Sequence, residues 1–177
     1  RWLAELPGPE ALWGKVQVGV IRGSQSTWFE ARPELQDWDR GFPATVYVQE
    51  SSRHFLTQVD AIAEQVPVHR LRLWDLGDAD GLVRTLSGMP FLARIRDLMV
   101  TSSFLRDDGA VSLACSPYAN GLRFVSLTAE WLSDKTGQAF AESPFVGRLE
   151  MLHLVRNQFS EEVRAALRRR FGHLVHC

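Results

Sequence analysis

The chain has 177 residues, of which 45% are hydrophobic and 23% charged, as in a globular protein that buries a core without metal or disulfide. Its 20 basic and 21 acidic residues give a net charge of -1, which excludes a general electrostatic attraction to nucleic acid or an anionic membrane. Two cysteines are too few for a disulfide framework and favour a reducing, cytoplasmic location. No apolar run approaches the roughly 18 residues of a membrane span. The chain begins at Arg1 without a methionine, which leaves open whether it is complete.

The first 41 residues carry apolar side chains without a clean period. We expect a short helix near residues 9–15, a strand near residues 16–21 and an exposed loop over residues 23–27. Four tryptophans make this stretch rich in aromatic side chains: Trp2, Trp13, Trp28 and Trp38. We expect them to cover one end of the fold, with a partner interface as the alternative, because tryptophan is enriched at binding hot spots.

Residues 42–66 predict one strand followed by one helix. Residues 45–49 alternate in the manner of a short strand. Serines at positions 51 and 52 are suited to cap a helix that runs to about residue 65, with an apolar face that includes Phe55 and Val59. Val48 precedes Leu73 by nearly the length of the repeat described next. We therefore interpret residues 1–66 as an N-terminal capping region with a degenerate first repeat.

A repeat of constant length runs through the remainder of the chain. Each copy has a triplet in which two apolar residues flank a variable one, as in Leu71-Arg72-Leu73. Such a triplet predicts a short strand whose two apolar side chains face the core. The last residues of the four triplets are 27 apart: Leu73, Val100, Leu127 and Leu154.

Other positions recur in the same register. An acid follows each triplet by seven residues: Asp80, Asp107, Asp134 and Glu161. We expect this acid to begin a short helix and to cap the free N–H groups there. A proline then ends the helix in three copies, at Pro90, Pro117 and Pro144. The unit is thus strand, turn, short helix and turn, which buries its apolar face only by stacking on its neighbours.

These columns resemble the leucine-rich repeats of bacterial proteins, of the ribonuclease-inhibitor-like type. The resemblance covers roughly residues 67–177 and implies four repeats, the last a C-terminal cap. It implies an α/β fold, a short right-handed solenoid with parallel strands on the concave face and helices on the convex face. The family's asparagine, three residues past the triplet, occurs only as Asn157, while the equivalent positions hold Leu76, Ser103 and Glu130. Residues 38–43 also resemble the entry into the arrays of bacterial relatives.

Catalytic motifs are absent from the sequence. It has no P-loop, no G-x-G-x-x-G, no G-x-S-x-G and no H-E-x-x-H. Acids recur at the same position of each repeat. This recurrence favours a helix-capping role over a calcium site or an acid/base pair for four of them: Asp78, Asp80, Asp107 and Asp108. We expect no enzymatic activity and no cofactor.

The histidines and cysteines do not form a recognisable metal pattern. His173, His176 and Cys177 could contribute to a zinc site, but a structural zinc takes four ligands. We therefore expect no metal, and a capping role for the C-terminus. Cys115 is expected to be a small buried thiol and not a nucleophile.

The best candidates for nucleic-acid contact are near the C-terminus: Arg164, Arg168, Arg169 and Arg170. They fall at the end of an expected helix, where the helix dipole favours cations. We expect a solvated helix face there, with a phosphate contact or a protein contact as alternatives.

Residues that alternate with the buried anchors are expected to project from the concave face. Among them are arginine and tryptophan, which are typical binding anchors, and methionine, which adapts to irregular partners. An exposed apolar band on such a face indicates that a partner protein covers it. The alternative is that these side chains only pack against one another within the curved array. The candidate partner-binding residues are Arg70, Arg72, Trp74, Met99, Phe124, Met151 and His153.

We therefore expect a non-enzymatic protein–protein interaction module, a subunit or domain of a larger complex, that binds another protein through the concave face. This expectation depends partly on analogy, because a fold alone does not determine function. Two alternatives stay open. One is a nucleic-acid-associated accessory subunit that uses the arginine-rich C-terminal helix; the other is a regulator or inhibitor of a partner enzyme. Nucleic acid is otherwise expected to bind only weakly or indirectly, and no membrane contact is expected.

Overall fold

A computed structural model of the chain describes residues 20–22, 38–39, 42–43, 45–49, 52–65 and 68–177. The helix expected near residues 9–15 and the loop expected over residues 23–27 lie outside this part, as do Trp2, Trp13, Trp28 and the side chain of Trp38. The first described element, strand β1 (Val20–Arg22), overlaps the end of the strand expected near residues 16–21.

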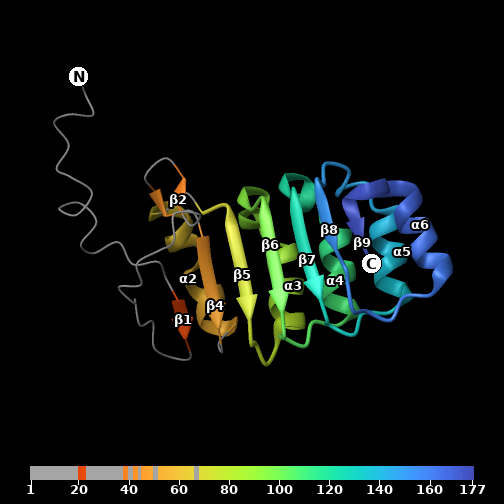
Figure 1. Cartoon of the computed structure of the whole chain (residues 1–177). Helices are drawn as coiled ribbons and strands as arrows, with labels where there is room; N and C mark the ends of the chain where they lie inside the picture. The colour runs from red at the N-terminus through yellow and green to blue at the C-terminus, as the bar shows by residue number, and fades with distance from the viewer. Residues whose placement is uncertain (1–19, 23–37, 40–41, 44, 50–51, 66–67) are drawn as a thin grey trace, which may run out of the picture.

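Seven parallel strands form one sheet in the described part of the chain (Figure 1). Its order is β1, β4 (Thr45–Gln49), β5 (Arg70–Trp74), β6 (Asp97–Thr101), β7 (Phe124–Thr128), β8 (Met151–His153) and β9 (Val175–His176). Two short strands, β2 (Trp38–Asp39) and β3 (Phe42–Pro43), pair antiparallel in a separate sheet. From β4 onward, strand order across the sheet therefore follows chain order, as short connections dictate.

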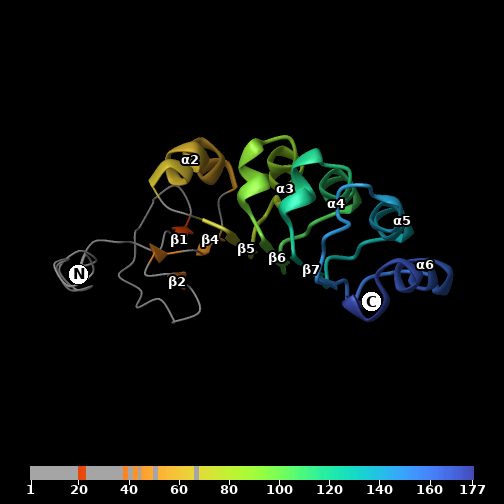
Figure 2. The same cartoon turned by 90° about the horizontal axis from the view of Figure 1, so that it is seen from above.

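Helices alternate with the strands and all lie on one side of the sheet (Figure 2). They are α2 (Ser52–Gln65), α3 (Ala79–Ser87), α4 (Asp107–Ala114), α5 (Asp134–Glu142) and α6 (Glu161–Phe171). Within the described part of the chain, each expected helix is present and begins within one residue of its predicted start. The α/β class is thus confirmed, with a parallel sheet that has helices on one face. We call the opposite face, which bears no described helix, the open face.

The repeat register predicted from the sequence is confirmed by the strand pairing. Leu71 pairs with Leu98, Leu98 with Val125, and Val125 with Leu152, each one full repeat further along the chain. These anchor side chains are almost fully buried between sheet and helices. Val48 pairs with Leu73, so β4 continues the same rows.

The last unit departs from the register. Val175 pairs with Leu152 after less than a full repeat. Gly172, at φ 60°, ends α6, and only the short 3-10 helix η4 (Gly172–Leu174) separates α6 from the last strand. His176 follows Leu154 by 22 residues, as the buried Ile95, Leu122 and Leu149 follow the last residues of the earlier triplets, but it does not share their burial. His176 is exposed and lies opposite His153 on the neighbouring strand.

A ladder of side chains links successive units where the asparagine column is incomplete. The Oδ1 of Asn157 accepts hydrogen bonds from the N–H groups of Glu130 and Leu132, at 3.2 and 3.1 Å. The carboxylate of Glu130 in turn accepts them from the N–H groups of Ser103 and Leu105, at 3.2 and 2.9 Å. Glutamate and serine thus take the acceptor role of the missing asparagines.

Glu130 performs this role at an electrostatic cost. Burial raises the pKa of its carboxyl group, and the backbone N–H groups that bind it do not fully offset that effect. Unlike Asn157, an ionised glutamate has no N–H to donate to a carbonyl. The substitution therefore satisfies the backbone donors of the neighbouring unit but makes local stability depend on pH.

The recurring acids cap helices, but not the helices in which they lie. Asp80, in α3, accepts hydrogen bonds from the N–H groups of Arg106 and Gly109 at the start of α4, at 3.1 and 2.7 Å. Asp134, in α5, likewise accepts from the N–H of Ser160, at 2.7 Å, before α6. The caps within the units themselves are Asp78 for α3, Ser133 for α5 and Ser160 for α6. The recurring acids therefore add hydrogen bonds between successive units.

Candidate functional site

The open face is built from side chains that alternate with the buried anchors along each strand. Because the strands are parallel and in register, these side chains stack in rows across the sheet. The first row is Arg70, Asp97, Phe124 and Met151, and the second is Arg72, Met99, Ser126 and His153. Tyr47 extends the second row at one end, with the guanidinium of Arg72 over its ring, 5.8 Å from the centroid.

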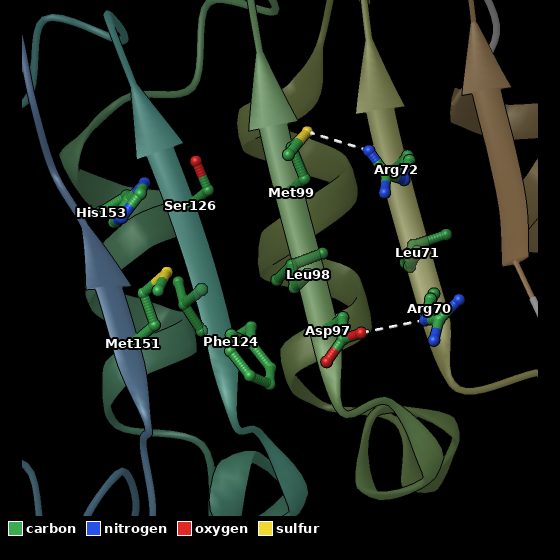
Figure 3. A pocket seen from close by; sticks show the side chains of 11 residues that line it. Arg70, Leu71, Arg72, Asp97, Leu98, Met99, Phe124, Ser126, Met151 and His153 are labelled. Carbon is green, nitrogen blue, oxygen red and sulfur yellow. Dashed lines mark hydrogen bonds and ion pairs between the residues drawn. The ribbon is translucent and has the colours of Figure 1, made fainter. Parts of the chain in front are cut away.

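These two rows enclose a hollow of about 270 Å³ (Figure 3). Its lining contains six of the seven residues predicted to bind a partner: Arg70, Arg72, Met99, Phe124, Met151 and His153. The seventh, Trp74, lies at the end of β5 with 58% of its surface exposed, outside the lining of the hollow. Sequence periodicity thus located residues that the fold brings together from four strands.

The hollow is basic at one side and apolar at the other. Arg70 is paired with Asp97 at 3.1 Å, and the guanidinium of Arg72 contacts the sulfur of Met99 at 3.7 Å. Figure 3 shows both contacts between β5 and β6, with Phe124 and Met151 on the strands beyond. Met99, Phe124 and Met151 each leave more than a third of their surface exposed. Such a lining suits a ligand with apolar side chains.

Two polar side chains of the hollow have partners nearby. The hydroxyl of Ser126 hydrogen-bonds with that of Thr128 at 3.2 Å, and the ring of His153 packs edge-on against His176, with centroids 4.7 Å apart.

Two exposed aromatic side chains were missed by the sequence reasoning. Phe104 and Trp131 are 68% and 73% exposed, lie one repeat apart in the loops after β6 and β7, and border a second, smaller hollow. Both have left-handed backbone, with φ 51° and 60°, which is unfavourable for bulky residues. The sequence does show a pattern that could have identified them, because an aromatic residue follows both Val100 and Leu127 by four residues.

The four arginines proposed to contact nucleic acid differ in their surroundings. Arg164 donates to the carbonyl of Phe159, at 3.2 Å, and lies 3.6 Å from Glu161. Arg170 donates to the carbonyls of Ala141 and Ser143, at the C-terminal end of α5. Arg168 and Arg169 are exposed on α6, with no ion pair among the described residues. Two of the four thus contribute contacts within the fold itself.

The burial expected for Cys115 is wrong. It is exposed just after the last turn of α4, whereas the next residue, Ser116, is buried and donates a hydrogen bond to the carbonyl of Ser87 at 2.5 Å. The turn thus directs the serine inward and leaves the cysteine in solvent. Across the described part of the chain, no group of three or more His, Cys, Asp or Glu side chains is placed to hold a metal ion.

Comparison with known proteins gives no family assignment. No protein-family model matches the chain, and a search of curated proteins finds no significant match. Among the helices that the structure describes, none is both long and apolar enough to cross a bilayer.

Proposed function

We propose that the chain is a short solenoid of the leucine-rich-repeat type that acts as a non-enzymatic protein-interaction module, a subunit or domain of a larger cytoplasmic assembly. The solenoid interpretation is supported by the repeat register of the strands, by the helices on one face and by the side-chain ladder that ends at Asn157. Such arrays offer extended binding surfaces.

The single observation that carries the proposed function is the hollow on the open face. It gathers partly exposed methionine, phenylalanine and arginine side chains from four adjacent strands. Partly apolar, preformed surfaces with aromatic and arginine side chains are typical of interface cores. In this proposal Met99, Phe124 and Met151 supply apolar contact, while Arg70, Arg72 and Trp74 anchor one end and His153 borders the other.

The proposed mechanism is recognition by a rigid surface. The side chains of the hollow project from paired strands, and several are already held in place: Arg70 by Asp97, and Arg72 by Met99 and Tyr47. Fewer rotatable groups then have to be ordered on binding, which lowers the entropy cost of association. A regulator or inhibitor of an enzyme would use the same surface, with an active site as its target.

The test is affinity capture from a native lysate of the source cells, with wild type compared to a Trp74→Ala, Met99→Ala, Phe124→Ala variant. The matched control removes two exposed aromatics elsewhere, by Phe104→Ala and Trp131→Ala. We expect a stoichiometric partner with wild type and the control, and its loss with the open-face variant. Circular dichroism establishes that each variant is folded. A partner retained by the open-face variant would contradict the proposal.

The nucleic-acid alternative has a separate test. It requires that Arg168→Glu and Arg169→Glu abolish binding and that binding weakens steeply with salt. The other two candidate arginines, Arg164 and Arg170, already donate hydrogen bonds within the fold. Only Arg168 and Arg169 are then left to contact phosphates, and this does not favour the nucleic-acid alternative.

A further inference from the structure

A third hollow lies at the edge of the sheet where the parallel strands begin, and its lining is rich in arginine. Its volume is about 790 Å³. Residues at this edge recur at the repeat spacing: His69, Arg96, Arg123 and Glu150 directly precede β5, β6, β7 and β8. We call this the arginine edge, with Arg70, Arg94, Arg96, Arg123 and Arg148 as its cations.

The backbone of the arginine edge is held firmly. The carbonyl of His69 accepts hydrogen bonds from the N–H groups of both Arg96 and Asp97, at 2.8 and 3.1 Å. The carbonyl of Arg96 accepts in the same way from Arg123 and Phe124, at 2.7 and 3.0 Å. The side chains of His69, Arg96 and Arg123 therefore project from the starts of adjacent strands, which are about 4.8 Å apart in a parallel sheet.

Gly121 opens the space between two of the arginines. It occupies the repeat position that holds Arg94 in one neighbouring unit and Arg148 in the other. A Cβ atom at Gly121 would lie 2.5 Å from the carbonyl oxygen of Ala93, so a side chain is excluded there. The glycine thus lets the two turns pack closely and adds no side chain between the turns that carry Arg94 and Arg148. The guanidinium of Arg94 itself donates to the carbonyl of Ala63 in α2, at 2.6 Å.

Positive charge is in excess at the arginine edge. Five arginines face two carboxylates, and those two are already engaged: Asp97 with Arg70 at 3.1 Å and Glu150 with Arg123 at 3.9 Å. Arg96 and Arg148 are exposed and have no ion pair among the described residues. The chain as a whole carries a net charge of -1, so this excess is local.

We infer that the arginine edge binds carboxylates of an acidic segment in the protein partner, next to apolar residues of that segment seated in the open-face hollow. This inference rests on the proposed function. Guanidinium groups bind carboxylates in bidentate fashion, which makes an acidic segment the complementary partner. Arg70, Asp97 and Phe124 line both hollows, so the two sites are continuous.

A protein segment fits this edge better than a nucleic acid does. Asp97 and Glu150 lie among the arginines and would repel a phosphate backbone, whereas a protein segment carries carboxylates only at particular positions. Arg96 directly precedes β6, and Met99 lies three residues further along the chain, about 10 Å at the rise of a β-strand. The carboxylates are therefore expected about three residues from the apolar anchor in an extended segment.

The test selects peptides from a random library displayed on phage against four folded proteins. These are wild type, an edge variant (Arg96→Glu, Arg148→Glu), a hollow variant (Met99→Ala, Phe124→Ala) and a charge-matched control (Arg168→Glu, Arg169→Glu). We expect wild type and control to enrich peptides with acidic residues next to apolar ones. The edge variant is expected to lose the acidic enrichment and to bind a wild-type-selected peptide about tenfold more weakly.

The outcomes separate the two proposals. Apolar peptides without acidic enrichment, bound equally by the edge variant, would overturn the arginine edge and leave the open-face hollow standing. Acidic peptides that the hollow variant binds as well as wild type would support the edge but contradict the proposed function. No selected peptide from wild type, or tighter binding of a single-stranded oligonucleotide that the edge variant loses, would overturn the inference.

Discussion

Asp107 and Ser133 join two consecutive helices through a pair of hydrogen bonds. The N–H and the hydroxyl of Ser133, the residue before α5, donate to the carboxylate of Asp107 in the first turn of α4, at 2.9 and 2.6 Å. Thr136 donates to the same carboxylate, at 2.6 Å. Burial would raise the pKa of Asp107, but the hydrogen bonds from Ser133 and Thr136 outweigh it, and the pKa lies below the ordinary value of 3.8.

The first prediction concerns this link. Asp107→Ala removes the acceptor that holds Ser133, the residue that caps α5, and is expected to lower the free energy of unfolding by about 1–2 kcal/mol at neutral pH. Because the pKa of Asp107 is depressed, its contribution is present above pH 3.8 and is lost as pH falls through the folded-state pKa. Urea unfolding at pH 7 and near pH 3 measures this.

The matched control is Asp108→Ala at the adjacent residue. Asp108 is exposed and forms an ion pair with Lys135 at 2.7 Å, in full contact with water, where such pairs contribute little. An equal loss of stability in both variants would contradict the role of Asp107 in holding Ser133 at the start of α5.

The second prediction concerns the buried glutamate in the side-chain ladder. In Glu130→Gln an amide oxygen accepts from Ser103 and Leu105 without a buried charge, so the variant should match or exceed wild-type stability at pH 7. Burial raises the pKa of Glu130 above 4.5, so the folded state binds the proton more tightly than the unfolded state. The stability of wild type relative to the variant therefore falls as pH rises from 4.5 through the folded-state pKa.

Chemical unfolding of both proteins from pH 4 to pH 8 checks this dependence. Glu130→Ala serves as the comparison, because it leaves buried N–H groups unpaired and should cost about 1–3 kcal/mol. A difference between wild type and the glutamine variant that does not change with pH would refute the electrostatic role of Glu130.

The third prediction concerns close packing between α5 and α6. A Cβ atom at Gly137 would overlap the side chain of Val163, which is buried. Gly137→Ala should therefore destabilise the protein by about 1–3 kcal/mol, although alanine is the better helix former. Thermal unfolding measures the change, and Gly137→Ala with Val163→Ala should recover part of it. Stabilisation by Gly137→Ala alone would show that the helices have room to separate.

The sequence alone predicted the parts of the structure that follow from local periodicity. The anchors Leu71, Leu98, Val125 and Leu152 are buried in register because a period-two triplet and a fixed repeat length determine both face and spacing. The lining of the open-face hollow followed from the same alternation, since side chains next to buried anchors point the other way.

Features that depend on contacts between units were not predicted. The acids cap the next helix and not their own, as Asp80 does for the start of α4, because stacking brings the carboxylate closer to that neighbour. The exposure of Cys115 and of Trp131 depends on the exact course of turns, which apolar periodicity does not encode. The arginine edge, apart from Arg70, was missed because its members come from turns and strand ends of four different units.

The measurement that tests the central claim most directly is site-specific photo-crosslinking in the source cells. A crosslinking amino acid replaces Ser126, within the open-face hollow, and in a matched variant replaces Gln138, exposed on the helix side in α5. We predict a discrete protein adduct from position 126 that is absent from position 138 and is lost when Met99 and Phe124 are changed to alanine. An adduct at position 138 alone would place the partner on the helix side and contradict binding through the open face.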